Sequence, residues 1–181
     1  MTLEVAVIAV VRLLGALPVL RWAFVGALIA IAVDLSDLFL MNLLHLGGVP
    51  NYQSFDKWAD QVYLLAFLVV AQRWAAVPRR IAVALYAFRA IGFLLFAATG
   101  ARWVLFAFPN VFEFWFVLVA SLPHWRPAFT FTRRHAALAL AGVTAAKLAH
   151  EYVVHIARAL DGFTAVEAVQ AIWRALTSPL G

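Results

Sequence analysis

Four aspartates between Asp34 and Asp60 have the residue type and spacing of a metal-binding site. Asp34 and Asp37 are three residues apart, and Asp56 and Asp60 are four apart, so each pair shares one face of a predicted helix. The loop over residues 47–55 folds the two helices back on each other and can bring the four carboxylates together. Acidic residues inside a bilayer are costly and usually functional, so we expect the site here.

The charges around these aspartates do not balance. Alternating helices place six acids in or near the same half of the membrane: Asp34, Asp37, Asp56, Asp60, Glu113 and Glu151. Lys57, Arg89 and Lys147 contribute three positive charges, so the nine side chains together have a formal charge of −3. In a low-dielectric setting this charge requires protonated carboxyl groups or bound cations. Carboxylate oxygens suit Mg²⁺, Mn²⁺ or Ca²⁺, and we expect the four aspartates to be the ligands.

Further polar residues lie on the later helices. Five of them are expected to form a structural polar core: Asn110, Glu113, Lys147, His150 and Glu151. For the two glutamates, buried ion pairs with Arg89 and Lys147 that fix the helix register are favoured over a functional role. Arg89 lies near the middle of its apolar segment and needs an anionic partner or a bound anion. Arg89 and Lys57 are our candidates for binding an anionic substrate.

The elements that must position these residues are membrane helices. The chain has 181 residues, of which 66% are hydrophobic and 13% charged, and its mean hydropathy is +0.92, whereas soluble domains are about 25% charged. We expect an all-α, polytopic membrane protein with about six transmembrane segments, the first one short: 3–17, 21–46, 56–73, 81–99, 103–122 and 133–160. The chain has no cysteine, which excludes disulfides and thiolate metal sites.

The C-terminal stretch of the chain has a different hydrophobic pattern from the apolar segments before it. Residues 164–177 have apolar side chains on one face and polar ones on the other, which is typical of an amphipathic helix lying on the membrane surface. We therefore divide the chain into a helical membrane domain, 1–162, and an amphipathic C-terminal helix and tail, 163–181.

Near the N-terminus, Arg12 lies within the first apolar segment, and we expect its guanidinium to reach the lipid headgroups.

Seven of the 14 Lys and Arg residues flank the end of the membrane domain opposite the aspartates, against four near the aspartates. The seven are Arg21, Arg73, Arg79, Arg80, Arg126, Arg133 and Arg134. The positive-inside bias puts this end in the cytoplasm and the aspartates on the other side. Positive charge in such loops favours lipid headgroups over nucleic acid as partners. We expect a multi-pass protein of a bacterial-type inner or plasma membrane, with lipids as partners and a protein partner or a homodimer as further options.

The aspartate spacing resembles the motif of the CDP-alcohol phosphotransferase family, D-x2-D-G-x2-A-R-x8/9-G-x3-D-x3-D. All four acidic positions are present, while the motif's Gly, Ala, Arg and second Gly positions hold Leu38, Met41, Asn42 and Tyr52. The Arg-Leu-Leu…Pro run over 12–18, the run FDKWADQVYLL and Arg89 are similar to the family as well. The resemblance covers about residues 8–100 and identifies the chain as a divergent member.

The resemblance implies a six-helix fold and metal-dependent transfer chemistry. It implies that Asp34, Asp37 and Asp56 bind Mg²⁺ or Mn²⁺, which holds the phosphates of the substrate. Asp60 would be a further ligand or the base that takes the proton of the attacking alcohol. Two alternatives follow from the resemblance. The chain acts on a lipid or lipid-like phosphate, or it has lost this activity.

Two other functions are compatible with the sequence. The substituted Gly and Arg positions of the motif favour a non-enzymatic small membrane subunit or scaffold, whose polar core is structural and whose tail docks a partner. A weaker alternative is an ion or proton pathway through the polar half of the helices. The sequence therefore leaves open whether the protein is an enzyme.

Overall fold

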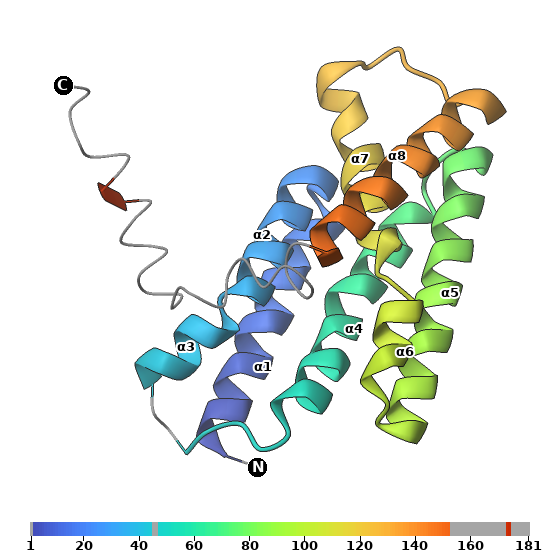
Figure 1. Ribbon diagram of the computed structural model, residues 1–181. Helices are drawn as coiled ribbons and strands as arrows, with labels where there is room; N and C mark the ends of the chain where they lie inside the picture. Colours follow the sequence, from blue (N-terminus) through green and yellow to red (C-terminus); the bar gives the residue numbers. More distant parts are fainter. Residues whose placement is uncertain (1, 45–46, 153–172, 175–181) are drawn as a thin grey trace.

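The computed structural model describes residues 2–44, 47–152 and 173–174 of the chain. Within these ranges the chain is helical and contains no strand, as the predicted all-α class requires. The elements (Figure 1) are α1 (Leu3–Ala16), the 3-10 helix η1 (Leu17–Leu20), α2 (Ala23–Leu35), α3 (Asp37–Leu44), α4 (Tyr52–Ala71), α5 (Ala76–Thr99), α6 (Arg102–Ala107), α7 (Val111–Trp125) and α8 (Arg133–Glu151).

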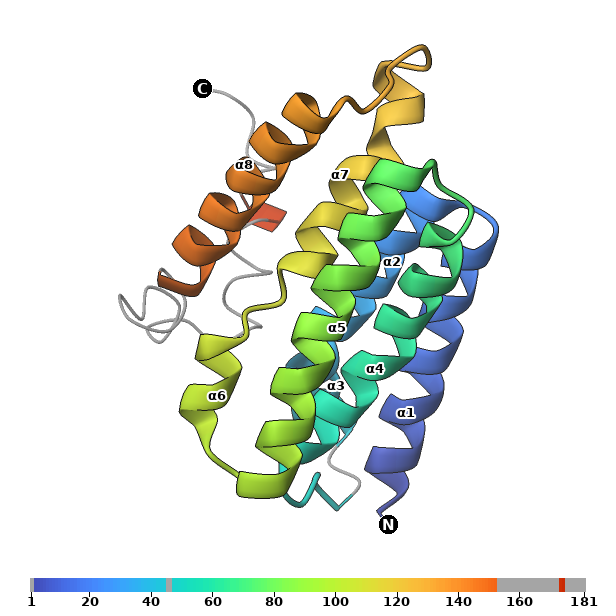
Figure 2. The ribbon, with the colours of Figure 1, turned by 90° about the vertical axis from the view of Figure 1, so that its right-hand side faces the viewer.

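The long helices form a bundle in which α1, α2, α4, α5, α7 and α8 alternate in direction (Figures 1 and 2). Helices α1, α2 and α4 contact one another, and α5 and α7 pack against α4. The core between α4 and α7 is aromatic: Phe67 stacks on Phe116 with ring centroids 4.1 Å apart, and Trp115 is fully buried. Close aromatic packing of this kind fixes α4 against α7, and both helices carry residues of the site.

Three helical stretches within the described residues are long and apolar enough to cross a membrane: Leu3–Leu20, Ala76–Thr99 and Trp103–Trp125. The first stretch joins α1 and η1, because Pro18 stands in the first turn of a 3-10 helix, where its missing N–H costs nothing. The segment predicted to be short is therefore 18 residues long. The further spans that the sequence indicates stay predictions.

Two of the predicted segments are interrupted. The segment over 21–46 divides at Ser36, so Asp34 ends up in α2 and Asp37 in α3. The Ser36 hydroxyl donates to the Val33 carbonyl at 2.7 Å, a side-chain bond that competes with the helical one. The segment over 103–122 divides at Pro109, since proline has no N–H with which to continue the helix. The prediction of one continuous helix for Asp34 and Asp37 is therefore wrong.

The last predicted segment begins as α8 at Arg133, and α8 ends at Glu151. The part of that segment after residue 152, most of the amphipathic helix predicted over 164–177 and the domain boundary at residues 162–163 lie outside the described residues. Residues 173 and 174 are described and are helical.

Candidate functional site

Arg12 stands at the centre of the four predicted aspartates. Its Nη1 lies 2.5 Å from Asp34 Oδ1 and donates to Asp60 Oδ1 at 2.9 Å. Its Nη2 donates to Asp37 Oδ2 and to Asp56 Oδ1, both at 2.6 Å. Arg12 is 4% exposed, because α1 packs against α2, α3 and α4. The prediction that Arg12 reaches the lipid headgroups is therefore wrong.

The structure brings the four aspartates together from three helices, α2, α3 and α4. A second cation joins them: Lys57 Nζ lies 2.5 Å from Asp56 Oδ2 and 3.0 Å from Asp60 Oδ2. The four carboxylates and the two cations leave a formal charge of −2 among these six described side chains. We call Arg12, Lys57 and the four aspartates the aspartate cluster.

Three carboxylates of the aspartate cluster are placed to share a cation. Asp34, Asp56 and Asp60 each offer one oxygen, and these oxygens lie within 4.8 Å of one another. Asp34 Oδ1 is buried and forms an ion pair with Arg12 Nη1, without a hydrogen bond of regular geometry to a described residue. Asp37 is 1% exposed and accepts both of its Arg12 hydrogen bonds on Oδ2. Asp37 thus makes two of the hydrogen bonds that hold Arg12, and its predicted role as a metal ligand stays a prediction.

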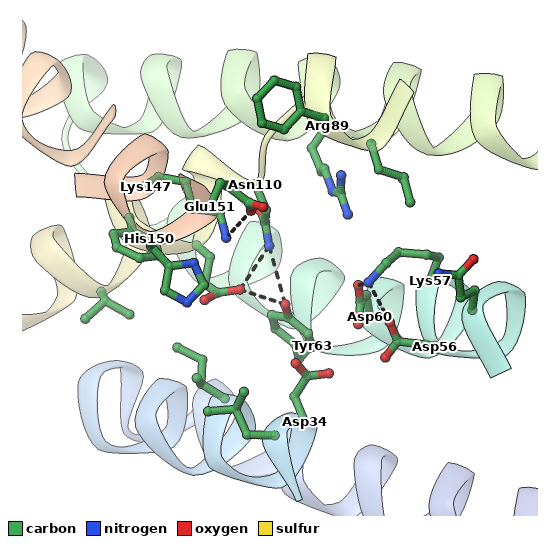
Figure 3. Close-up of a pocket in the computed structure, with 18 of the residues that line it drawn as sticks. Asp34, Asp56, Lys57, Asp60, Tyr63, Arg89, Asn110, Lys147, His150 and Glu151 are labelled. Carbon is green, nitrogen blue, oxygen red and sulfur yellow. Dashed lines mark hydrogen bonds and ion pairs between the residues drawn. The ribbon is translucent and has the colours of Figure 1, made fainter. Parts of the chain in front are cut away.

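A cavity of about 940 Å³ adjoins the aspartate cluster and is lined by residues of α2, α4, α5, α6, α7 and α8. Figure 3 shows Asp56, Lys57 and Asp60 at one side of it and Lys147, His150 and Glu151 at the other. Tyr52, at the start of α4, also lines the cavity. Burial, with Asp56 and Asp37 nearby, raises the pKa of Tyr52, so its phenol stays neutral and able to donate a hydrogen bond.

A second polar group lines the cavity away from Asp56 and Lys57. Tyr63 Oη and Asn110 Nδ2 both donate to Glu113 Oε2, at 2.8 and 2.9 Å. Lys147 Nζ pairs with Glu151 Oε1 at 2.8 Å, as predicted for that glutamate. Among the described contacts, Glu113 is held by two neutral donors in place of the predicted ion pair. We call the following residues the inner wall: Tyr63, Arg89, Asn110, Glu113, Lys147 and Glu151.

Arg89 donates a hydrogen bond to a backbone carbonyl at the helix interruption between α6 and α7. Its Nη1 donates to the Phe108 carbonyl at 2.9 Å, next to Pro109, so a backbone oxygen takes the place of the predicted anionic partner. Its Nε has no hydrogen-bond partner among the described residues, and the residue is 5% exposed. The predicted anion-binding role of Arg89 and Lys57 stays a prediction, as does the structural role of His150, whose ring lies 6.0 Å from that of Phe114.

Sequence reasoning missed two residues that organise the site, Arg12 and Glu4. Glu4 is 1% exposed and accepts a hydrogen bond from the Gly48 N–H at 2.9 Å, while the Thr2 hydroxyl donates to the Gly48 carbonyl at 2.7 Å. These bonds tie the loop between α3 and α4 to the N-terminus. Both residues are charged and stand in an apolar run, so the rule that marked the aspartates as functional would have marked them too.

The chain matches no family model, and the comparisons with curated proteins and with solved structures return no match. A function must therefore be inferred from the chemistry of the cavity, with the aspartate cluster at one end and the inner wall at the other.

Proposed function

We propose that this is a multi-pass integral membrane protein, of the bacterial inner- or plasma-membrane type, that binds a divalent cation and transfers a phosphoryl group on a lipid-like substrate. The observation that carries the proposal is the residual formal charge of −2 in the aspartate cluster, beside a cavity of about 940 Å³. One Mg²⁺ or Mn²⁺ offsets this charge. The resemblance to CDP-alcohol phosphotransferases supports the same assignment, because the four acidic positions of that motif are the ones that meet around Arg12.

The residues present suit a hard divalent cation. Asp34, Asp56 and Asp60 line the cavity and offer oxygens within 4.8 Å of one another. Carboxylate oxygens are the ligands that Mg²⁺ and Mn²⁺ prefer. Each carboxylate oxygen has two lone pairs, so the oxygens that accept from Arg12 or Lys57 keep capacity for a cation.

The chain's own residues can hold a phosphate-bearing substrate and move its proton. A bound cation would supply Lewis-acid polarisation of the phosphoryl oxygens. Arg12 and Lys57 each hold one oxygen of Asp60, and we propose Asp60 as the group that accepts the hydroxyl proton of the attacking alcohol. Lys57 and Arg89 line the cavity and offer positive charge to a phosphate. Apolar side chains such as Ile31 and Val117 complete the lining, which suits a lipid.

A metal-dependent stability measurement tests the proposal. We expect Mg²⁺ or Mn²⁺ to raise the thermal midpoint of the purified protein in a saturable way, because a ligand of the folded state stabilises it by mass action. The double variant Asp56→Asn plus Asp60→Asn is expected to lose this rise. Glu151→Gln, an acid-to-amide change on the inner wall, is the matched control and keeps it. A wild-type protein whose midpoint ignores both ions would remove the proposal.

A non-enzymatic subunit or scaffold is the second candidate. Arg12 joins α1 to aspartates of α2, α3 and α4, which is the arrangement of a clamp that fixes helix positions. A protein of this kind would act through a protein partner or as a homodimer. Co-purification with a fixed partner, together with unchanged function after Asp37→Asn plus Asp60→Asn, would favour it over the enzyme.

A further inference from the structure

Four arginines stand at the starts of α5 and α8, at the end of the bundle opposite the aspartate cluster (Figures 1 and 2). We call them the arginine surface: Arg79, Arg80, Arg133 and Arg134. All four are exposed, and their side chains make no hydrogen bond or ion pair among the described residues. Neither helix has an acid in its first turn, although the positive end of a helix dipole favours acids there. Both helix starts are therefore strongly positive.

One buried tryptophan brings these two helix starts together. Trp115 of α7 is fully buried, and its Nε1 donates to the Pro78 carbonyl at 3.2 Å. The centroid of its ring lies 5.6 Å from that of Phe131. Pro78 directly precedes Arg79, and Phe131 stands two residues before Arg133. The two arginine pairs are therefore held on adjacent helix ends.

The positive charge of the arginine surface has no counter-charge within the described part of the chain. The described acids are the four aspartates of the aspartate cluster, Glu113 and Glu151 of the inner wall, and Glu4, which binds the loop between α3 and α4. All of them lie in or beside the cavity or at the N-terminal start of α1. A partner that complements the arginine surface is therefore anionic.

The arginine surface lies where a membrane interface is expected. The apolar stretch Ala76–Thr99 is long enough to cross a membrane and begins three residues before Arg79. Trp125 closes the stretch Trp103–Trp125 at the same end of the bundle and is 74% exposed, and tryptophans at the ends of spanning helices sit at headgroup level. Arginines at the end of a spanning helix extend to the headgroups. The predicted cytoplasmic position of this end matches the leaflet that is rich in anionic lipids.

We infer that the arginine surface binds the phosphate of an anionic phospholipid. A guanidinium donates parallel hydrogen bonds to phosphate oxygens, and pairs on two adjacent helices hold one headgroup from two sides. The lipid would tie α5 to α8, the helices that carry Arg89 and Lys147 of the inner wall. The arginine surface lies apart from the cavity, so lipid binding there requires neither the metal nor the transfer chemistry proposed above.

Lipid titration of the purified protein in detergent and EDTA tests the inference. Phosphatidylglycerol, phosphatidylcholine and sn-glycerol 3-phosphate would be added separately, and the bound fraction measured by native mass spectrometry. We expect the first phosphatidylglycerol to bind about tenfold more tightly than phosphatidylcholine, because its headgroup keeps a net negative charge. Glycerol 3-phosphate should bind far more weakly, since it has no acyl chains to bury against the apolar helices.

A double variant places the binding at the arginine surface. Arg79→Gln plus Arg133→Gln removes one arginine from each pair. We expect phosphatidylglycerol to bind about 25-fold more weakly, since each basic residue near a headgroup changes the affinity about fivefold. Both side chains are exposed, so the thermal midpoint without lipid should stay close to that of the wild type.

The matched control removes the same charge from the same end of the bundle. In Arg21→Gln plus Arg73→Gln, the replaced side chains lie over the Trp22 ring and on the Leu20 carbonyl, away from the starts of α5 and α8. This variant should weaken phosphatidylglycerol binding less than about threefold at 0.15 M salt, where distant charges are screened.

Three results would overturn the inference. Phosphatidylglycerol bound no more tightly than phosphatidylcholine would remove the anionic site. Equal weakening in the two double variants would assign the binding to the general charge of this end. Glycerol 3-phosphate bound as tightly as phosphatidylglycerol would assign the arginine surface to a soluble phosphate. Because EDTA removes divalent ions, none of these results depends on whether the aspartate cluster binds Mg²⁺ or Mn²⁺.

Discussion

The two ends of the cavity contain similar residues but handle their charge differently. At the inner wall, two acids face two cations and the formal charges cancel. In the aspartate cluster, four acids face Arg12 and Lys57, and two negative charges remain. Buried acids are thus no evidence of a metal site by themselves. The ratio of acids to cations within reach of one another separates a balanced wall from a cluster with a residual negative formal charge.

Removing Arg12 should have the largest effect on this contrast. Arg12→Met leaves four aspartates with Lys57 as the described cation beside them, and loss of one member of a buried charge network costs about 3–5 kcal/mol. We expect a loss of this size in the free energy of unfolding, measured by denaturant titration in detergent without metal. We also expect tighter Mn²⁺ binding, since the residual formal charge becomes −3.

Arg73→Met is the control for this experiment. Arg73 is an exposed arginine that donates to the Leu20 carbonyl at 3.0 Å, and surface changes of this kind stay within about 0.5 kcal/mol. Equal stability losses for the two variants, or no gain in Mn²⁺ affinity for Arg12→Met, would show that Arg12 does not compensate the aspartates.

The position of Arg12 also shows how far the sequence could predict the site. The four aspartates were found from their spacing, because i, i+3 and i, i+4 positions share a helix face, and the structure brings them together. Arg12 is the one arginine of its apolar segment, and such a side chain is expected to reach the lipid interface. A single helix does not reveal which neighbour it packs against, and the partners of Arg12 are 22 to 48 residues further along the chain. That contact is tertiary and leaves no local pattern.

Glycine 92 tests how the inner wall is positioned. A Cβ at Gly92 would stand 2.3 Å from Phe108 Cβ, and Phe108 supplies the carbonyl that Arg89 binds. Gly92→Ala should therefore push the break between α6 and α7 away from α5 and cost about 1–3 kcal/mol of unfolding free energy. Gly142→Ala, on α8, is the matched control, because a Cβ there meets nothing within 4 Å. Equal stability of the two variants would mean that α5 is not in this close contact with the break between α6 and α7.

Loss of the hydrogen bond between Tyr63 and Glu113 should lower the free energy of unfolding by less than the loss of Arg12. Its effect should be confined to the inner wall. Tyr63→Phe removes a donor from the buried Glu113 carboxylate, for a loss of about 1–2 kcal/mol. The metal-dependent rise of the thermal midpoint should remain, because the aspartate cluster keeps all its members. Tyr86→Phe is the control, since the Tyr86 ring packs on Phe112 and the change preserves that ring. Loss of the metal response in Tyr63→Phe would show that the two ends are one site.

Side-specific labelling sharpens the comparison without a stability change. The basic residues at the bundle end away from the aspartate cluster predict that this end is cytoplasmic. The chain has no cysteine, so single variants Ser54→Cys and Ala76→Cys report the two ends cleanly. An impermeant maleimide on intact cells is expected to label Ser54→Cys and to leave Ala76→Cys unlabelled until lysis. The opposite pattern would place the aspartate cluster in the cytoplasm.

The interruptions in the helices were partly predictable. A proline inside an apolar segment predicts a kink or a new helix start, and the structure shows a break at Pro109, because proline acts through its own ring and missing N–H. The division at Ser36 was not foreseen, since serine in a helix interior can be satisfied in several ways. The pairing of Tyr63 with Glu113 crosses from α4 to α7 and depends on packing that no local pattern encodes.

Counting bound ions tests the central claim most directly. Purified wild-type protein would be titrated with Mn²⁺ and the free ion measured by electron paramagnetic resonance, beside Asp34→Asn plus Asp56→Asn and the control Glu151→Gln. The residual formal charge of −2 predicts one Mn²⁺ per chain in the wild type and in Glu151→Gln, and none in the double variant. No saturable Mn²⁺ binding in the wild type, or the same stoichiometry in the double variant, would contradict the account.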